Sequence, residues 1–288
     1  MVGVRKKTRH TLKVTTTLFS ISVFSFGIIF GVLYYGQKHL EALGAIQAKE
    51  AKSAWEQELI RREERKIAEI NKYKPNGNPR SIIDDLYYLT LTKGEVKIAT
   101  FGSSVTNGDG ASGPEYKWAN LLIRYIQGVD GLRNTVLLSN GFPGHSTEMV
   151  MLQNYVNNVI AAKPDIILLE TFVLNDHGQS IPLKKTRENL EFMLQKIKEA
   201  LPQAKVIVLS PNPKKGDTKN SIGAYYKDYV ALSEEFAAAN NLDYIDIYTR
   251  MTEANSNINA LLADGVHPND VGYKIWFDIV KAYFEQKK

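Results

Sequence analysis

The hydrophobic positions follow three different patterns along the chain, and each pattern predicts a different kind of structure. Residues 15–35 are mostly apolar and carry no charge, and about 20 helical residues suffice to cross a hydrocarbon core of about 30 Å. Residues 37–71 are rich in Ala, Glu, Lys, Arg and Gln, which favours an exposed helix. From about Ser81, short apolar runs alternate with amphipathic stretches. The sequence therefore predicts a membrane segment, a charged stalk and a globular domain.

These patterns give the expected domain organisation. The segments are a basic cytoplasmic tail (1–14), a transmembrane helix (15–36), a helical stalk (37–72), a turn-rich linker (73–80) and a globular domain (81–288). The basic tail keeps the N-terminus cytoplasmic by the positive-inside rule, so the globular domain is expected to be periplasmic, extracellular or lumenal. A cleaved signal peptide is the alternative, although the apolar run exceeds the usual 7–15 residues of such peptides.

The stalk admits two interpretations. Its apolar residues are too sparse for a sustained heptad seam, so a solvated spacer helix is the simpler one. The other is a contact with a second copy or with a membrane protein through Trp55 and Leu59.

The globular domain alternates predicted strands and helices. The strands are expected at 96–101, 135–139, 165–172, 205–210 and 244–247, and the helices at 115–129, 146–162, 182–201, 224–240 and 270–286. Short β-branched strands that alternate with amphipathic helices indicate an α/β fold whose parallel sheet is covered on both faces.

Composition excludes several classes of function. The net charge of +5 comes largely from the basic N-terminal tail, and the globular domain has no basic stripe of the kind that binds nucleic acid. The chain has no cysteine, which excludes disulfides, thiolate metal sites and a cysteine nucleophile. We expect no nucleic-acid partner.

Four polar segments follow predicted strands or lie in the last loop before the C-terminal helix. They are residues 102–106, 140–144, 174–176 and 264–268. Because the carboxyl ends of parallel strands share one edge of a sheet, these segments can converge there.

The residues in these segments suit nucleophilic acyl transfer. That chemistry needs a hydroxyl nucleophile, a base, a group that orients the base, and donors for the developing oxyanion. Ser104, His267 and Asp264 supply the first three. The backbone N–H groups of Ser104 and Gly144 and the side-chain amide of Asn175 supply the donors.

In this order, the segments resemble the SGNH (GDSL-type) hydrolase superfamily, which contributes Ser, Gly, Asn and His from four blocks. The resemblance covers about residues 96–281 and implies a flavodoxin-like three-layer α/β/α sandwich. It implies that Ser104 is the nucleophile, that Gly144 and Asn175 complete the oxyanion hole, and that Asp264 and His267 complete the triad. The chain departs from the family pattern at Ser103, where the family usually has Asp, and at Val173, where it usually has a small residue.

Other residues of these segments are candidates for the substrate cleft. They are Ser103, Asn107, His145, Asp176 and His177. No two histidines have the spacing of metal ligands, so we expect neither a metal nor a cofactor.

The resulting hypothesis is a membrane-anchored serine esterase or O-acyltransferase. Its substrate would be an O-acylated, for example acetylated, glycan or lipid outside the cytoplasm. The alternative is a non-catalytic scaffold subunit of a membrane assembly. The two differ in whether the Ser104 hydroxyl lies within hydrogen-bond reach of His267, about 2.6–3.2 Å.

Overall fold

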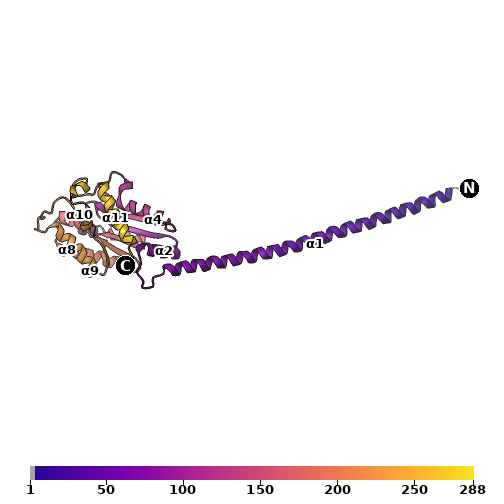
Figure 1. Cartoon of the computed structure of the whole chain (residues 1–288), viewed down its shortest axis with the longest axis horizontal. Coiled ribbons are helices and arrows are strands. Elements are labelled where there is room, and N and C mark those ends of the chain that lie inside the picture. Colours follow the sequence, from indigo (N-terminus) through magenta and orange to yellow (C-terminus); the bar gives the residue numbers. More distant parts are fainter. Residues whose placement is uncertain (1–3) are drawn as a thin grey trace. The chain divides into compact units, whose positions relative to one another are not determined.

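The computed structural model describes residues 4–288, with side chains from Lys13 onward. The first helix, α1 (Val4–Tyr73), is continuous, so the expected transmembrane helix and stalk are parts of one helix (Figure 1). Residues 1–3 and the side chains of 4–12 in the expected basic tail lie outside the described part. The chain divides into two compact units, Met1–Ala68 and Glu69–Lys288, which are described separately.

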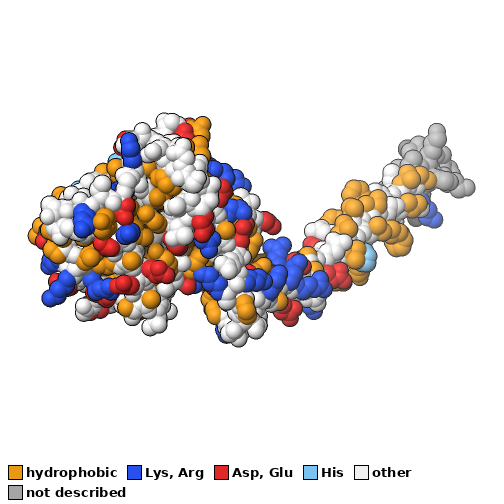
Figure 2. Space-filling model, turned by 60° about the vertical axis from the view of Figure 1, so that its left-hand side comes forward, with side chains coloured by type: hydrophobic (Ala, Val, Ile, Leu, Met, Phe, Trp, Pro, Cys, Tyr) orange, Lys and Arg blue, Asp and Glu red, His pale blue; other side chains and the backbone are white. Residues whose placement is uncertain are grey.

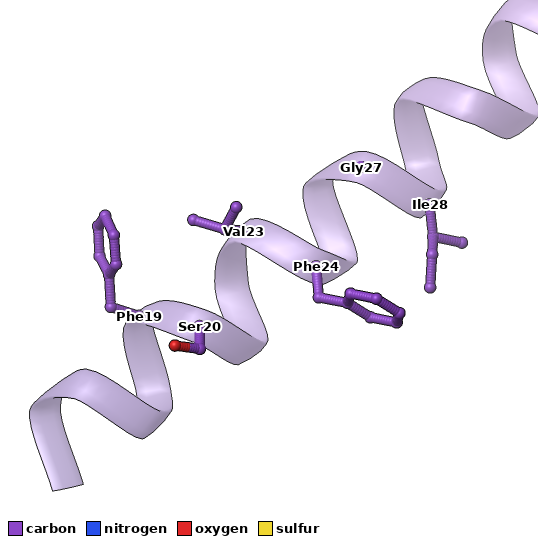
Figure 3. A pocket seen from close by; sticks show the side chains of 6 residues that line it. All are labelled: Phe19, Ser20, Val23, Phe24, Gly27 and Ile28. Carbon is purple, nitrogen blue, oxygen red and sulfur yellow. The ribbon is translucent and has the colours of Figure 1, made fainter. Parts of the chain in front are cut away.

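The N-terminal unit has the length and composition of a membrane span. Its apolar window has a mean hydropathy of 2.0 and none of it is buried, and a signal sequence would have the same features. Figure 2 shows hydrophobic side chains along this part of α1 and charged ones nearer its C-terminal end. The apolar surface includes a shallow hollow formed by α1 alone and lined by Phe19, Ser20, Val23, Phe24, Gly27 and Ile28 (Figure 3).

The C-terminal unit is built on a parallel sheet. Its strands are β1 (Val96–Gly102), β2 (Thr135–Gly141), β3 (Ile166–Glu170), β4 (Lys205–Leu209) and β5 (Asp243–Ile245). The five strands lie in the order β2-β1-β3-β4-β5, and every pairing is parallel. This is a flavodoxin-like order, and its switch point, where ligands bind in such folds, lies between β1 and β3.

Helices cover both faces of the sheet, which confirms the expected three-layer α/β/α sandwich (Figure 1). One face packs against α2 (Ile82–Lys93), α4 (Trp118–Gly128), α10 (Ile247–Ala254) and α11 (Asp270–Glu285). The other packs against α5 (Thr147–Leu152), α6 (Val156–Ala162), α8 (Leu183–Ala200) and α9 (Tyr226–Ala239). Alternate strand residues serve the two cores: Ile98 and Leu168 face the first, Ala99 and Leu169 the second.

The structure corrects several predicted elements. The helix expected over 146–162 is two helices, because Asn154 takes a left-handed conformation (φ 60°) between α5 and α6. The strand expected over 165–172 ends at Glu170, and left-handed Phe172 (φ 62°) precedes the helix α7 (Val173–Gly178). The last strand ends at Ile245 because Asp246 caps α10. The helix expected over 115–129 is a 3-10 turn, Pro114–Tyr116, followed by α4.

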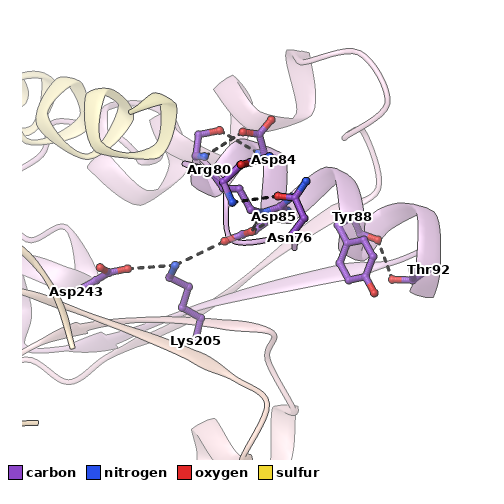
Figure 4. A network of polar contacts seen from close by, with 10 residues as sticks. Asn76, Arg80, Asp84, Asp85, Tyr88, Thr92, Lys205 and Asp243 are labelled. Carbon is purple, nitrogen blue, oxygen red and sulfur yellow. Dashed lines mark hydrogen bonds and ion pairs between the residues drawn. The ribbon is translucent and has the colours of Figure 1, made fainter. Parts of the chain in front are cut away.

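The N-terminal edge of the sheet carries a network of ion pairs (Figure 4). Ser81 and Asp84 form a capping box that starts α2. Next to it, Arg80 pairs with Asp85 at 2.9 Å. Lys205 lies 3.6 Å from Asp85 and 3.2 Å from the carboxylate of Asp243 on β5. This edge is therefore held by partly exposed charges, opposite to the edge that carries the candidate site.

Candidate active site

Ser104 lies two residues after the end of β1 and is the first residue of the one-turn helix α3 (Ser104–Asn107), which Ser103 precedes as N-cap. Its exposed fraction is 4%, so its hydroxyl is reached from one side only. The chain turns sharply here because Gly102 packs closely: a Cβ at this position would lie 2.2 Å from Thr106 Oγ1 and 2.7 Å from Glu170 Oε2. Only glycine fits at position 102, because any side chain there would clash with Thr106 on α3 and with Glu170.

The loop before α11 brings His267 to Ser104. His267 Nε2 lies 2.9 Å from Ser104 Oγ, and His267 Nδ1 lies 2.7 Å from Asp264 Oδ2. The backbone N–H groups of Val266 and His267 also donate to Asp264 Oδ1, at 2.9 and 2.8 Å. The three side chains that the sequence singled out therefore form one hydrogen-bonded chain, Ser104–His267–Asp264.

Contacts between the loop after α3 and the loop before α11 hold Ser104 close to His267 and Asp264. Gly110 (φ 94°) lies so close to the histidine loop that a Cβ would be 2.5 Å from the Pro268 carbonyl oxygen and 2.9 Å from His267 Cβ. The backbone N–H and hydroxyl of Ser112 donate to Asp270 at 2.8 and 2.6 Å. The loop after α3 and the segment that leads into α11 are therefore in direct contact beside the site.

The electrostatics of Asp264 favour its ionised form. Burial alone would raise its pKa, but the hydrogen bonds from the His267 ring and from the backbone N–H groups of His267 and Val266 outweigh it and lower the pKa to about 2. Asp264 is 55% exposed and the His267 side chain 24% exposed. The carboxylate can therefore orient the imidazole at neutral pH, in a site that water reaches.

The predicted oxyanion residues lie on the turns after the two strands that flank β1. Gly144 has a left-handed backbone (φ 73°) in the turn after β2. Asn175 lies on α7, after β3, and its side-chain amide donates to the His145 carbonyl oxygen at 2.9 Å. Near the base of these turns, the Phe142 N–H donates to the Gly102 carbonyl oxygen at 2.8 Å. The turns that carry Ser104, Gly144 and Asn175 are thus linked to one another.

The structure divides the five candidate cleft residues into two groups. Ser103 and Asp176 are fully buried. His177 is 5% exposed and packs between Tyr226 and Tyr229. These three lie mostly beneath the surface, as Ser104 does at 4%, and their place in the substrate cleft stays a prediction. Asn107 and His145 are partly exposed and remain candidates.

Two buried carboxyl groups beside the site have roles that sequence reasoning missed. Glu170 accepts the Ser103 N–H at 2.6 Å. Asp176 accepts the N–H and hydroxyl of Thr147, at 2.7 and 2.6 Å, and thereby ties α7 to the start of α5. Burial raises the pKa of Asp176 to about 6, against the opposing hydrogen bonds from Thr147 and Thr186. The sequence feature that could have pointed to Glu170 is its position as a single charged residue at the end of an otherwise apolar strand.

The site has no arrangement suited to a metal. Within the part of the chain that the structure describes, no three His, Asp or Glu side chains gather as metal ligands would. The chemistry available from the residues in place is general base catalysis by an imidazole on a serine hydroxyl.

Comparison with known proteins gives a consistent picture. Residues 100–275 match the GDSL-like lipase/acylhydrolase family. A GDSL esterase/lipase of Arabidopsis thaliana is 22% identical over an alignment of 219 residues, and the match covers 66% of this chain and 86% of that protein.

The fold is shared with solved esterases. An acetylxylan esterase from Geobacillus stearothermophilus superimposes with a TM-score of 0.56 at 18% identity, covering 66% of this chain and 94% of that one. The acetyl xylan esterase AlAXEase superimposes with a TM-score of 0.54 at 21% identity, covering 65% of this chain and 98% of that one. At identities of 18% and 21%, these matches show a shared fold and no more than that. The family match, residues 100–275, lies within the C-terminal unit.

Proposed function

This chain belongs to the GDSL-like lipase/acylhydrolase family, and from that premise we propose that Ser104, His267 and Asp264 are its catalytic triad. The observation that carries the proposal is the 2.9 Å distance between Ser104 Oγ and His267 Nε2. It lies inside the range that a nucleophile and its base need. It also favours an enzyme over the scaffold alternative, because a scaffold subunit has no use for this alignment.

The proposed reaction is ester hydrolysis through an acyl-enzyme. His267 Nε2 takes the proton of Ser104 as the serine oxygen attacks the ester carbonyl carbon. The imidazolium that forms is stabilised by Asp264, which also holds the ring in its productive orientation through Nδ1. Collapse of the tetrahedral intermediate expels the alcohol, which receives the proton from His267. Water, deprotonated by the same histidine, then attacks the acyl carbon, and the bond to Ser104 Oγ breaks as that oxygen takes the proton back from His267 and the acid leaves.

The oxyanion of the intermediate would be held by the backbone N–H groups of Ser104 and Gly144 and by the Asn175 amide. This assignment is supported by the links among the three turns, namely the bond from Phe142 to Gly102 and the bond from Asn175 to the His145 carbonyl. Each such donor typically contributes about 10²–10³ in kcat.

The substrate we propose is an O-acetylated glycan. The neighbours in fold include esterases of acetylated xylan or xylo-oligosaccharides, and the partly exposed side chains of His267 and Asp264 are within reach of a chain substrate. The exposure of Asp264 and His267 supports hydrolysis over transfer, because water can reach the acyl-enzyme. An acyltransferase would need an acceptor hydroxyl to outcompete that water.

We also propose that α1 anchors the enzyme in a membrane with the C-terminal unit outside the cytoplasm. The support is its uncharged, fully exposed apolar segment preceded by Arg5, Lys6, Lys7 and Arg9. The contact of the stalk with a second copy or a membrane protein stays a prediction, with Trp55 and Leu59 exposed on α1.

The experiment that tests the triad uses the full chain in detergent and a fluorophosphonate probe. The wild type should be labelled at Ser104, as read by peptide mass spectrometry, and the Ser104→Ala and His267→Ala variants should not be. Ser103→Ala is the matched control, because Ser103 is the adjacent serine and is fully buried. A folded wild type that takes no label, or a label that survives Ser104→Ala, refutes the assignment.

The substrate and the location need separate measurements. Acetate release from acetylated xylo-oligosaccharides should depend on Ser104, and added sugar acceptors should not divert the acetyl group.

The location is tested by protease protection. In sealed inside-out vesicles, an external protease should leave the C-terminal unit intact. Its digestion there would place the unit on the cytoplasmic side and contradict the proposed topology.

A further inference from the structure

Glu170 is a buried carboxyl group at the carboxyl end of β3, directly beneath the serine turn. It is 1% exposed, and among the described side chains no lysine, arginine or histidine forms an ion pair with it. Burial raises its pKa, although the backbone N–H donors at Ser103 and Phe172 oppose the rise. A buried carboxyl group without a cationic partner costs several kcal/mol of stability, so its presence calls for a reason.

The two carboxyl oxygens hold two different turns of the candidate site. Oε2 accepts the N–H of Ser103, the residue before Ser104, at 2.6 Å. Oε1 accepts the N–H of Phe172 at 3.0 Å. Phe172 is the left-handed residue that precedes α7, the helix that carries Asn175. One carboxyl group therefore joins the turn of the nucleophile to the turn of an oxyanion donor.

The serine turn leaves space for this carboxyl group. Gly102 and Glu170 lie on the same face of the sheet, and a Cβ on Gly102 would lie 2.7 Å from both Glu170 Cβ and Glu170 Oε2. A larger residue at 102 would displace the carboxyl group from Ser103. Residue 103, which is Asp in the resembled motif, is Ser here, and its backbone N–H donates to the carboxyl group of Glu170 on β3.

We propose that Glu170 is a positioning residue, which fixes the Ser104 N–H and the Asn175 amide in one oxyanion geometry by holding the Ser103 and Phe172 N–H groups. This inference rests on the proposed role of Ser104 as nucleophile. Glu170 itself touches neither the substrate nor the triad. Loss of Glu170 is expected to weaken binding of the transition state more than binding of the substrate, because the oxyanion develops only as the reaction proceeds.

The test is Glu170→Gln in the full-length protein, with p-nitrophenyl acetate as substrate. Glutamine keeps the size of the side chain but replaces one acceptor oxygen by an NH₂ group that faces a backbone N–H. We expect kcat to fall about 10- to 100-fold, with KM within about threefold of wild type. The rate of fluorophosphonate labelling should fall by a similar factor, because the phosphoryl oxygen gains negative charge in the hole as the serine attacks.

Two further variants separate positioning from stability. Glu170→Asp keeps a carboxyl group but withdraws it from Ser103 and Phe172 by one methylene, and it should lose kcat as well. Thr100→Val is the matched control: Thr100 is fully buried on the same face of the sheet, its hydroxyl has no partner among the described residues, and kcat should stay within twofold. All rates are measured well below the lowest thermal midpoint of the set.

The outcomes separate this inference from the proposed function. If the wild type takes the label and a folded Glu170→Gln keeps its kcat, the positioning role is wrong and the triad stands. The positioning role is also wrong if the loss lies in KM alone, if Thr100→Val loses as much, or if neither Glu170 variant folds. A wild type that takes no label refutes the nucleophile and this inference together.

Discussion

The two edges of the sheet use charged groups in opposite ways. At the N-terminal edge, Lys205 and Asp243 pair while 40% and 32% of their side chains stay exposed, and exposed pairs of this kind contribute about 0–1 kcal/mol. At the carboxyl edge, Glu170 and Asp176 are buried and accept backbone N–H groups. The first arrangement adds a little stability. The second accepts a desolvation cost and provides hydrogen bonds to the backbone at Ser103 and Thr147.

The comparison predicts that substitutions at the carboxyl edge change kcat more than stability. Apart from the loss of Ser104 or His267, the largest decrease in kcat is expected for a substitution of Asp264. Asp264→Asn keeps the shape but favours the wrong tautomer of His267. We expect kcat to fall about 10²- to 10⁴-fold, with little change in the thermal midpoint because the side chain is exposed. Steady-state kinetics and a thermal melt measure both. A loss below about threefold would remove Asp264 from the triad.

Asn175→Ala should have the next largest effect. It deletes one expected oxyanion donor and the bond to the His145 carbonyl oxygen, so we expect kcat to fall about 10²-fold with a smaller change in KM. The measurement is kcat and KM for an acetyl ester. If the loss appears mainly in KM, Asn175 contacts the substrate in its ground state and the hole has a different third donor.

The sequence predicted the strands, and the proximity of Ser104, His267 and Asp264, better than it predicted the turns between the strands. Strand positions follow from short apolar runs, Ser104 and Asn175 from motifs that follow such runs, and His267 from the motif in the last loop before the C-terminal helix. The bond between Glu170 and Ser103 joins residues 67 positions apart, and no local pattern encodes such a contact. The break at Asn154 depends on one left-handed residue inside a helical composition. Helix α2 could have been found, because Ser81 and Asp84 have capping-box spacing.

Asp176→Asn tests the cost of a buried carboxylate. The pKa of Asp176 is about 6 in the folded protein and about 3.9 in an unfolded chain, so the folded state binds the proton more tightly. Its contribution to the unfolding free energy therefore falls as pH rises from about 4 to about 6, by about 2–3 kcal/mol. Urea unfolding between pH 4 and 7 should give a flatter profile for Asp176→Asn than for wild type. Parallel profiles would mean that Asp176 does not titrate in this range.

Lys205→Ala is expected to have the smallest effect, and it is the substitution most able to break the comparison between the edges. Lys205 loses its pairs with Asp85 and Asp243, but water already screens them, so we expect a loss of less than about 1 kcal/mol. For a domain of this size that is a midpoint shift of about 2–4 °C at most, and the shift should shrink at about 1 M salt. Activity should stay within about twofold of wild type, because the sheet separates this edge from Ser104. A tenfold loss of kcat with the fold intact would mean that the ion pairs of one edge set the geometry of the other.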